Sequence, residues 1–328
     1  MRVAVVDLGT NSTRLLIADV DRASGSVEQL VRRSQVTRLG AGVDSGGSLS
    51  DNAMARVFAT LTEYREAIDS YECEANLAVL TSAVRDAANG ASFAERVRDD
   101  FGLDARVLSG EEEAQLTFLG AMSGRPPEVG SSSSAGIEPI VVVDIGGGST
   151  EFVVGRGHTA GFHASLPAGV VRMSERHIHS DPPRPSELQD LAQDVRSTFL
   201  EGLPEEERGA VRKAIAVAGT ATSAAAIEQA LDPYDPERVH GFRLQLATVE
   251  LLLARLADMA EERRREVVGL HPDRAPTIVA GMILLSEAMR AFALEEVEVS
   301  EHDILFGGAL RLAAPGIVPA DGEDRPRV

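Results

Sequence analysis

The chain has 328 residues, 44% of them hydrophobic, and this length fits two domains of ordinary size better than a single core. Its 51 acidic and 32 basic residues give a formal net charge of −19, which argues against binding to nucleic acid polymers or anionic membranes. No apolar run approaches the ~20 residues of a membrane span, and Cys73 is the only cysteine, so we expect a cytoplasmic protein without disulfides.

The first part of the chain alternates strand and helix patterns. Apolar and β-branched residues at 3–6, 14–20 and 27–38 predict three strands. A helix is expected over 51–71, because Ser50 suits an N-cap and apolar residues recur at helical spacing. The elements that follow are a strand at 77–80, a helix opened by a capping box at Ser92 and Glu95, a strand at 105–108 and a helix over 111–122.

Residues 123–139 are rich in Gly, Pro and Ser and predict a linker, after which the same order of elements returns. Strands are expected at 140–144, 151–156, 160–165, 214–218 and 297–300. Helices are expected at 170–177, 187–200, from about 220, and at 249–261, 277–292 and 308–313. The doubled β-β-β-α-β-α-β-α order predicts an α/β protein with two ribonuclease H-like domains facing each other across an active-site cleft. We expect these at residues 1–124 and 125–314, followed by a flexible tail at 315–328.

One short motif occurs twice: VVDLGTNST at residues 5–13 returns as VVDIGGGST at residues 142–150. In each copy an apolar strand ends in Asp, a glycine-rich turn follows, and a second strand begins. Glycine lets a backbone come close to a ligand, so that consecutive N–H groups can point at an anion. The repeat therefore predicts two phosphate-binding hairpins, each with a carboxylate suited to a divalent cation.

A third glycine-containing turn, AVAGTATSAAA at residues 216–226, makes the set resemble the superfamily of actin, the large heat-shock chaperones and sugar kinases. Within it, the chain more closely resembles the exopolyphosphatase and guanosine pentaphosphate phosphohydrolase family. The motifs that carry this resemblance are DLGTNS (7–12), TSAVRDA (81–87), SGEEEA (109–114), DIGGGSTE (144–151) and LHPDRAPTIVAG (270–281). The resemblance implies two actin-like domains and hydrolysis of a terminal phosphoanhydride.

The SGEEEA motif contains the expected catalytic base. Ser109 and Glu112 have capping-box spacing, so Glu112 has a structural role, whereas Glu113 lies about 100° further round the helix and can face a cleft. The resemblance assigns the general base to the last glutamate before Ala, which is Glu113. The alternative is that these carboxylates only complement the helix dipole.

The resemblance also implies the groups that bind phosphate and metal. The turn residues expected to bind phosphate are Asn11, Ser12, Gly146, Gly147, Gly148 and Ser149. Asp144 and Glu151 are the expected Mg²⁺ ligands, directly or through water, with Asp7 a weaker candidate for the metal's water shell. Arg85 matches the family's phosphate-clamping arginine, since a guanidinium bonds two phosphate oxygens at once. Ligand-free polar turns and an ion pair of Arg85 with Asp86 are the alternatives.

We therefore expect an exopolyphosphatase that uses Mg²⁺ or another divalent cation, with guanosine pentaphosphate 5′-phosphohydrolase activity as the first alternative. A kinase of the actin-like superfamily, favoured by the turn at Gly219 and Thr220, or a nonenzymatic phosphate sensor are further alternatives. A homodimer also stays open, because the sequence does not fix the oligomeric state.

Two departures from the family limit what carries over. Longer family members have further C-terminal domains, so processive degradation of long chains is not expected here. In SEHDILFGGAL, Phe306 and Gly307 stand where the family often has Arg and Glu.

His177 and His179 are interpreted as helix-end histidines without a third metal ligand. Five arginines could form a track for a polyanion or belong to a solvated face: Arg172, Arg176, Arg184, Arg243 and Arg274.

Overall fold

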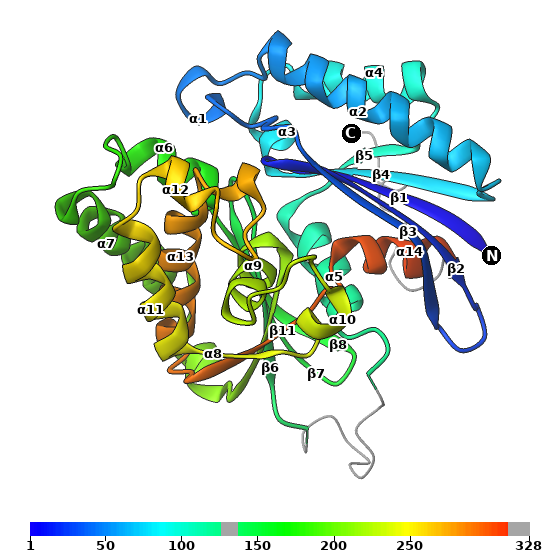
Figure 1. Ribbon diagram of the computed structural model, residues 1–328. Coiled ribbons are helices and arrows are strands. Elements are labelled where there is room, and N and C mark those ends of the chain that lie inside the picture. The colour runs from blue at the N-terminus through cyan, green and yellow to red at the C-terminus, as the bar shows by residue number, and fades with distance from the viewer. Residues whose placement is uncertain (126–136, 314–328) are drawn as a thin grey trace, which may run out of the picture.

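The protein is organised around two β-sheets with helices between and around them (Figure 1). This computed structural model describes residues 1–125 and 137–313. Part of the expected linker, and the expected tail at 315–328, therefore lie outside the described residues. In the described part of the chain, no helix is both long and apolar enough to cross a bilayer.

The first sheet has the strand order β3-β2-β1-β4-β5. Its strands are β1 (Arg2–Leu8), β2 (Ser12–Val20), β3 (Val27–Val36), β4 (Ala75–Leu80) and β5 (Ala105–Val107). The β1 strand pairs antiparallel with β2 and parallel with β4, as expected for a hairpin followed by a helical crossover. The helices of this part are α1 (Val43–Gly46), α2 (Asp51–Ser70), α3 (Ser82–Asp86) and α4 (Gly90–Phe101). We call this sheet with α1–α4 lobe 1.

The second sheet repeats the order as β8-β7-β6-β9-β11 and adds an antiparallel edge strand, β10. Its strands are β6 (Ile140–Ile145), β7 (Thr150–Arg156), β8 (Thr159–Leu166), β9 (Lys213–Val217), β10 (Arg243–Gln245) and β11 (Glu296–Val299). Its helices are α6 (Val170–His177), α7 (Pro185–Gly202), α8 (Glu205–Ala210), α9 (Ala218–Glu228), α10 (Pro236–Val239), α11 (Leu246–Ala257), α12 (Glu261–Arg264) and α13 (Ile278–Ala291). We call this sheet with α6–α13 lobe 2.

The alternation of side chains along the central strands gives each sheet two buried faces. In β1, Val6 faces the core formed with α2 and α4, whereas Val5 belongs to the cluster that contains Phe306. In β6, Val143 faces the core of lobe 2, and Val142 packs in a cluster with Phe118. Both central strands are therefore fully covered, which matches their continuous apolar sequences.

Two helices fill the space between the sheets: α5 (Gly110–Ala121) and α14 (Ile304–Ala313) (Figure 1). They also cross each other closely, because a Cβ atom on Gly120 would lie 1.9 Å from the Asp303 carbonyl oxygen, and one on Gly307 1.9 Å from that of Leu116. Although α14 follows the second sheet in the chain, it packs on the first sheet. The expected second domain, residues 125–314, includes this segment. Element order alone does not reveal that α14 packs on the first sheet.

Local signals were right in part. Ser50 caps α2 by accepting from the Ala53 N–H, and Ser109 and Glu112 form the expected capping box at α5. The expected capping box at Ser92 is wrong, because α4 already begins at Gly90 and Ser92 lies inside it. Gly90 packs so closely that a Cβ there would lie 1.9 Å from the Val84 carbonyl oxygen. This close contact explains why a glycine stands at the start of α4.

Candidate active site

The two copies of the repeated motif fold into the same turn. The Gly9 N–H donates to the Ser12 carbonyl at 3.0 Å, and the Gly146 N–H donates to the Ser149 carbonyl at 3.0 Å. Each turn follows the first strand of its sheet, so the sequence repeat is also a repeat of backbone structure.

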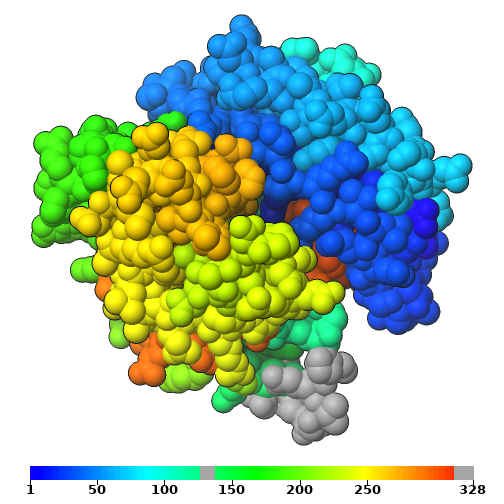
Figure 2. Space-filling view, viewed as in Figure 1, coloured from blue at the N-terminus to red at the C-terminus, as the bar shows by residue number. Residues whose placement is uncertain are grey.

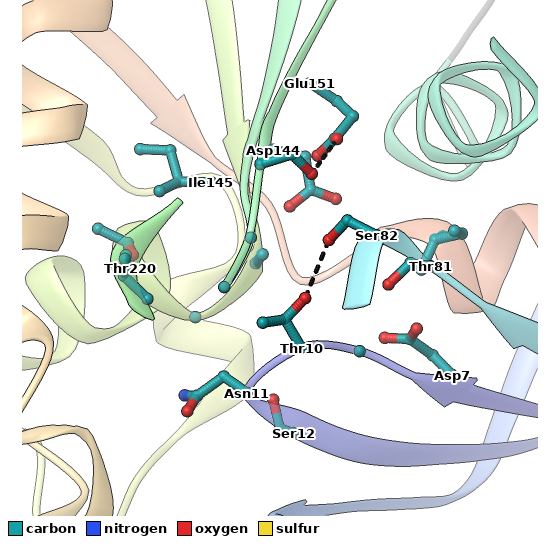
Figure 3. A pocket seen from close by; sticks show the side chains of 18 of the residues that line it. Asp7, Thr10, Asn11, Ser12, Thr81, Ser82, Asp144, Ile145, Glu151 and Thr220 are labelled. Atoms are coloured by element: carbon teal, nitrogen blue, oxygen red, sulfur yellow. Dashed lines mark hydrogen bonds between the residues drawn. The ribbon is translucent and has the colours of Figure 1, made fainter. Parts of the chain in front are cut away.

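The tips of the two turns touch each other. A Cβ atom on Gly147 would lie 2.7 Å from Cβ of Thr10 and 2.9 Å from the Asn11 backbone nitrogen. No side chain fits at Gly147 unless the turns separate. The Thr10 hydroxyl is also 2.9 Å from that of Ser82, at the start of α3, as the dashed line in Figure 3 marks.

A polar cleft of about 90 Å³ lies between the lobes, where both turns and the N-terminal end of α5 come together. The space-filling view shows a hollow between the blue surface of lobe 1 and the yellow-green surface of lobe 2 (Figure 2). Of the residues expected in the site, those that line the cleft are Asp7, Asn11, Ser12, Glu113, Asp144, Gly146, Gly147, Ser149 and Glu151. Arg85 lines an adjoining opening with Ser149, and Gly148 lines a smaller one with Arg172.

Glu113 faces this cleft from the first turn of α5 and is only 7% exposed. Its Oε2 atom accepts from Nη1 of Arg85 at 3.0 Å. Burial and the neighbouring charge of Glu151 raise the pKa of Glu113 well above its usual value, although Arg85 opposes the rise. A desolvated carboxylate with a raised pKa has the properties of a general base at neutral pH.

Asp144 and Glu151 face each other across the antiparallel pair of β6 and β7. Burial and then the charge of Glu151 raise the pKa of Asp144 to about 8. Burial also raises the pKa of Glu151, although its Oε1 accepts from the hydroxyls of Ser149 at 2.6 Å and Ser165 at 2.9 Å. Two like charges held this close without a cation favour protonation of one of them.

An ion-pair network that sequence reasoning missed lies at the base of the cleft. Arg14 contacts Oδ2 of Asp7 from Nη2 at 2.6 Å and also pairs with Asp303, just before α14. Burial raises the pKa of Asp7 despite this partner. The signal was present, because Asp7 and Arg14 are directly opposite in the register of β1 and β2, and a hairpin around DLGTNST brings them together.

The carboxylates of the cleft fit a hard divalent cation in its hydrated form. Among the described residues, the Oδ1 atom of Asp7 is buried without a hydrogen-bond partner, and the cleft is lined by four carboxylates. No group of three or more His, Cys, Asp or Glu side chains that could hold a metal occurs in residues 1–125 and 137–313. In proteins Mg²⁺ is usually held by one or two carboxylates together with water and substrate phosphate oxygens.

Some residues that line the cleft were not among the site residues expected from the sequence. Thr10, Ser82 and Thr277 line it, together with Arg274, which sequence reasoning considered only as part of a track. The guanidinium of Arg274 packs on Gly219, where a Cβ atom would lie 1.4 Å from Nη1. Gly219 is therefore needed for the approach of this arginine.

The remaining candidates have structural partners. His177 contacts Asp194 at 2.8 Å at the end of α6, which agrees with a helix-end histidine. Four of the five track arginines form ion pairs, namely Arg172, Arg176, Arg184 and Arg243. Phe306 is buried and stacks on His302 with 3.9 Å between ring centroids, so it contributes packing where the family often has a charge.

Sequence and structure comparisons find similar proteins of known family. The model of the Ppx/GppA phosphatase family matches residues 2–309. Exopolyphosphatase 2 of Mycobacterium tuberculosis is 38% identical over 323 residues, covering 95% of this chain and 98% of that protein. The crystal structure of an exopolyphosphatase-like protein superimposes with a TM-score of 0.87 at 31% identity, covering 95% of this chain and 97% of that one. The crystal structure of the Aquifex aeolicus member of the Ppx/GppA family gives a TM-score of 0.78 at 29% identity, covering 97% of this chain and 99% of that one.

Proposed function

Since the chain belongs to the Ppx/GppA phosphatase family and has its actin-like fold, we propose that this phosphoanhydride hydrolase releases the terminal phosphate of inorganic polyphosphate. The family resemblance inferred from the motifs is thereby confirmed. The similarity to exopolyphosphatase 2 of Mycobacterium tuberculosis supports polyphosphate as the substrate.

The observation that carries the proposal is the position of Glu113. Its carboxylate is buried in the first turn of α5, faces a cleft lined by two glycine turns, and is oriented by Arg85. A water molecule between this carboxylate and a phosphate held by the turns would be aligned for attack.

In the proposed reaction, the water oxygen forms a bond to the terminal phosphorus while the bridging P–O bond breaks. The shortened chain leaves with the bridging oxygen, and Glu113 accepts the proton of the water. Backbone N–H groups of residues 147–149, and those near Asn11 and Ser12, would hold the phosphate oxygens, whereas the Gly146 N–H already donates to the Ser149 carbonyl. Arg85 would add charge-assisted hydrogen bonds at the adjoining opening.

We also propose a divalent cation, with Mg²⁺ as the first choice, near Asp144 and Glu151. When bound, it would neutralise phosphate charge as the leaving oxygen develops negative charge. The residues themselves argue for it, because buried carboxylates with raised pKa values cannot all stay ionised next to a polyanion without compensating positive charge. The net charge of −19 makes this local compensation more necessary.

Guanosine pentaphosphate is a second candidate substrate, supported by a chamber of about 410 Å³ next to the cleft. The chamber shares Arg14, Gly219 and Arg274 with the cleft and has a more apolar lining that includes Tyr234. A chamber of this size could hold a nucleoside, and its four arginines, Arg14, Arg32, Arg33 and Arg274, suit the phosphate groups attached to it.

The experiment that tests the proposal measures phosphate release from short-chain polyphosphate, guanosine pentaphosphate and ATP, each with Mg²⁺ and with a chelator. We expect Mg²⁺-dependent release from polyphosphate. Faster release from guanosine pentaphosphate would favour the second candidate, and release from neither would contradict the proposed function.

The single cysteine keeps the cytoplasm as the expected compartment.

A further inference from the structure

A cluster of ion pairs joins the two lobes on the side of α6, beside the cleft. Arg172, in the first half of α6, pairs with Asp44 on α1 and with Asp86 at 2.9 Å at the end of α3. Both carboxylates belong to lobe 1, and the arginine belongs to lobe 2. The side chain of Arg172 is only 16% exposed, so these contacts are partly shielded from solvent.

Arg172 also holds the glycine-rich turn of the second hairpin. Its Nε atom donates to the Gly148 carbonyl at 2.8 Å, and its backbone N–H donates to the Gly147 carbonyl at 3.2 Å. These bonds engage carbonyl oxygens of the turn and do not occupy its amide N–H groups, which could bind an anion where they are free. One residue is therefore bonded to the turn and to both acidic partners across the lobe boundary.

The acidic partner Asp86 directly follows Arg85 on α3, and the Nε atom of Arg85 lies 4.0 Å from Oδ1 of Asp86. Asp86 thus lies between Arg172 and Arg85. The chain of contacts runs from the glycine turn through Arg172 and Asp86 to the guanidinium that orients Glu113.

We propose that Arg172 is a positioning residue that fastens the glycine turn of lobe 2 to α1 and α3 of lobe 1. It thereby sets the distance between the turn amides and Arg85, the two groups that would grip the same phosphate. This inference rests on the proposed function. Because the guanidinium is already shared between two carboxylates and a carbonyl, Arg172 acts through these contacts and does not bind the substrate itself.

A double-mutant cycle distinguishes positioning from direct binding, because the two roles predict opposite changes of KM in Asp44→Asn. With Arg172→Gln and Asp44→Asn we expect KM for short-chain polyphosphate to rise by roughly tenfold each, and the double variant to be little worse than Arg172→Gln. If Arg172 bound the substrate directly, Asp44→Asn would release it and lower KM. A lower KM in Asp44→Asn, or fully additive effects, would overturn the proposal.

Arg176→Gln is the matched control, because Arg176 also pairs with Asp44 but its other partner, Asp194, lies in lobe 2. We expect KM to change less than about twofold in this variant. An equal rise in Arg176→Gln and Arg172→Gln would contradict the specific role of Arg172. If Arg172→Gln fails to fold, Asp44→Asn alone still decides the sign.

A structural measurement separates this inference from the proposed function. Small-angle X-ray scattering of the substrate-free enzyme should give a larger radius of gyration for Arg172→Gln than for the wild type and Arg176→Gln, because the lobes are less firmly held together. Identical scattering from all three proteins would overturn the inference. This readout needs no turnover, so an enzyme inactive on every substrate would count against the proposed function alone.

Discussion

The Nη1 atom of Arg85 lies 3.0 Å from Oε2 of Glu113 and also 3.0 Å from the carbonyl oxygen of Leu108. A single guanidinium nitrogen thus ties the carboxylate at the start of α5 to the segment that leads into that helix. The ion pair is partly buried, so it is screened less by salt than a surface pair. It connects the expected phosphate clamp with the expected base.

Replacing Arg85 should change the pH dependence as well as the rate. The positive charge of Arg85 lowers the pKa of Glu113, so Arg85→Gln should raise that pKa and move the acid limb of the kcat/KM profile to higher pH. We also expect kcat/KM to fall roughly 10²-fold or more with the loss of a charged contact to phosphate. Arg106→Gln, which removes an arginine paired with exposed Asp104, is the control. An acid limb that stays in place would show that Arg85 does not act on the base.

The raised pKa of Asp144 predicts a pH dependence of stability. Asp144 has a pKa of about 8 in the folded protein, whereas an unfolded chain has about 4 for Asp. Between these values the folded state binds more protons, so the free energy of unfolding should fall as pH rises from about 4 to about 8. In chelator-treated protein, the melting temperature of the wild type should fall more steeply over this range than that of Asp144→Asn. Parallel curves would contradict the assignment.

Separating the two glycine turns should impair the site without unfolding a lobe. In Gly147→Ala the new methyl group would meet Thr10 and the Asn11 backbone, so the turns must move apart. We expect kcat/KM for polyphosphate to fall by roughly 10²-fold, since small misplacements of a site have effects of this size. Gly209→Ala is the control, because a Cβ there meets nothing within 4 Å. Equal activity of both variants would show that the contact between the turns is dispensable.

The Mg²⁺ dependence of phosphate release should involve Glu151. Chelation should abolish phosphate release, and added Mg²⁺ should restore it, because the phosphate charge then has a counter-ion. In Glu151→Gln the Mg²⁺ concentration for half-maximal activity should rise by roughly tenfold or more. The capping residue Glu112 provides the control through Glu112→Gln, which retains a side chain that can hydrogen-bond the Ser109 N–H. Full activity in chelator would refute the proposed cation.

Much of the fold could be predicted because its signals are local. The strands around Asp7 and Asp144 follow from apolar runs, and the repeated motif fixed the two hairpins and their equivalence. The position of α14 on the first sheet could not be predicted, because it depends on a crossing with α5 through Gly120 and Gly307, which are far apart in sequence.

The candidate site shows the same division. Glu113 could be singled out because the capping box occupies Ser109 and Glu112 and the family resemblance assigns the base to the last glutamate before Ala. The structure does place that carboxylate in the cleft. The pairing of Arg14 with Asp303 was missed, since it joins β2 to the segment before α14. Burial and pKa shifts of the cleft carboxylates also depend on packing between the lobes, which a sequence pattern does not contain.

The most direct test of the central claim compares phosphate release by Glu113→Gln and Glu111→Gln. The two glutamates share the first turn of α5, but Glu111 is exposed and Glu113 is buried in the cleft. We expect Glu113→Gln to lower kcat by roughly 10²–10⁴ with little change in phosphate affinity, and Glu111→Gln to match the wild type. A folded Glu113→Gln protein with wild-type kcat would contradict the account.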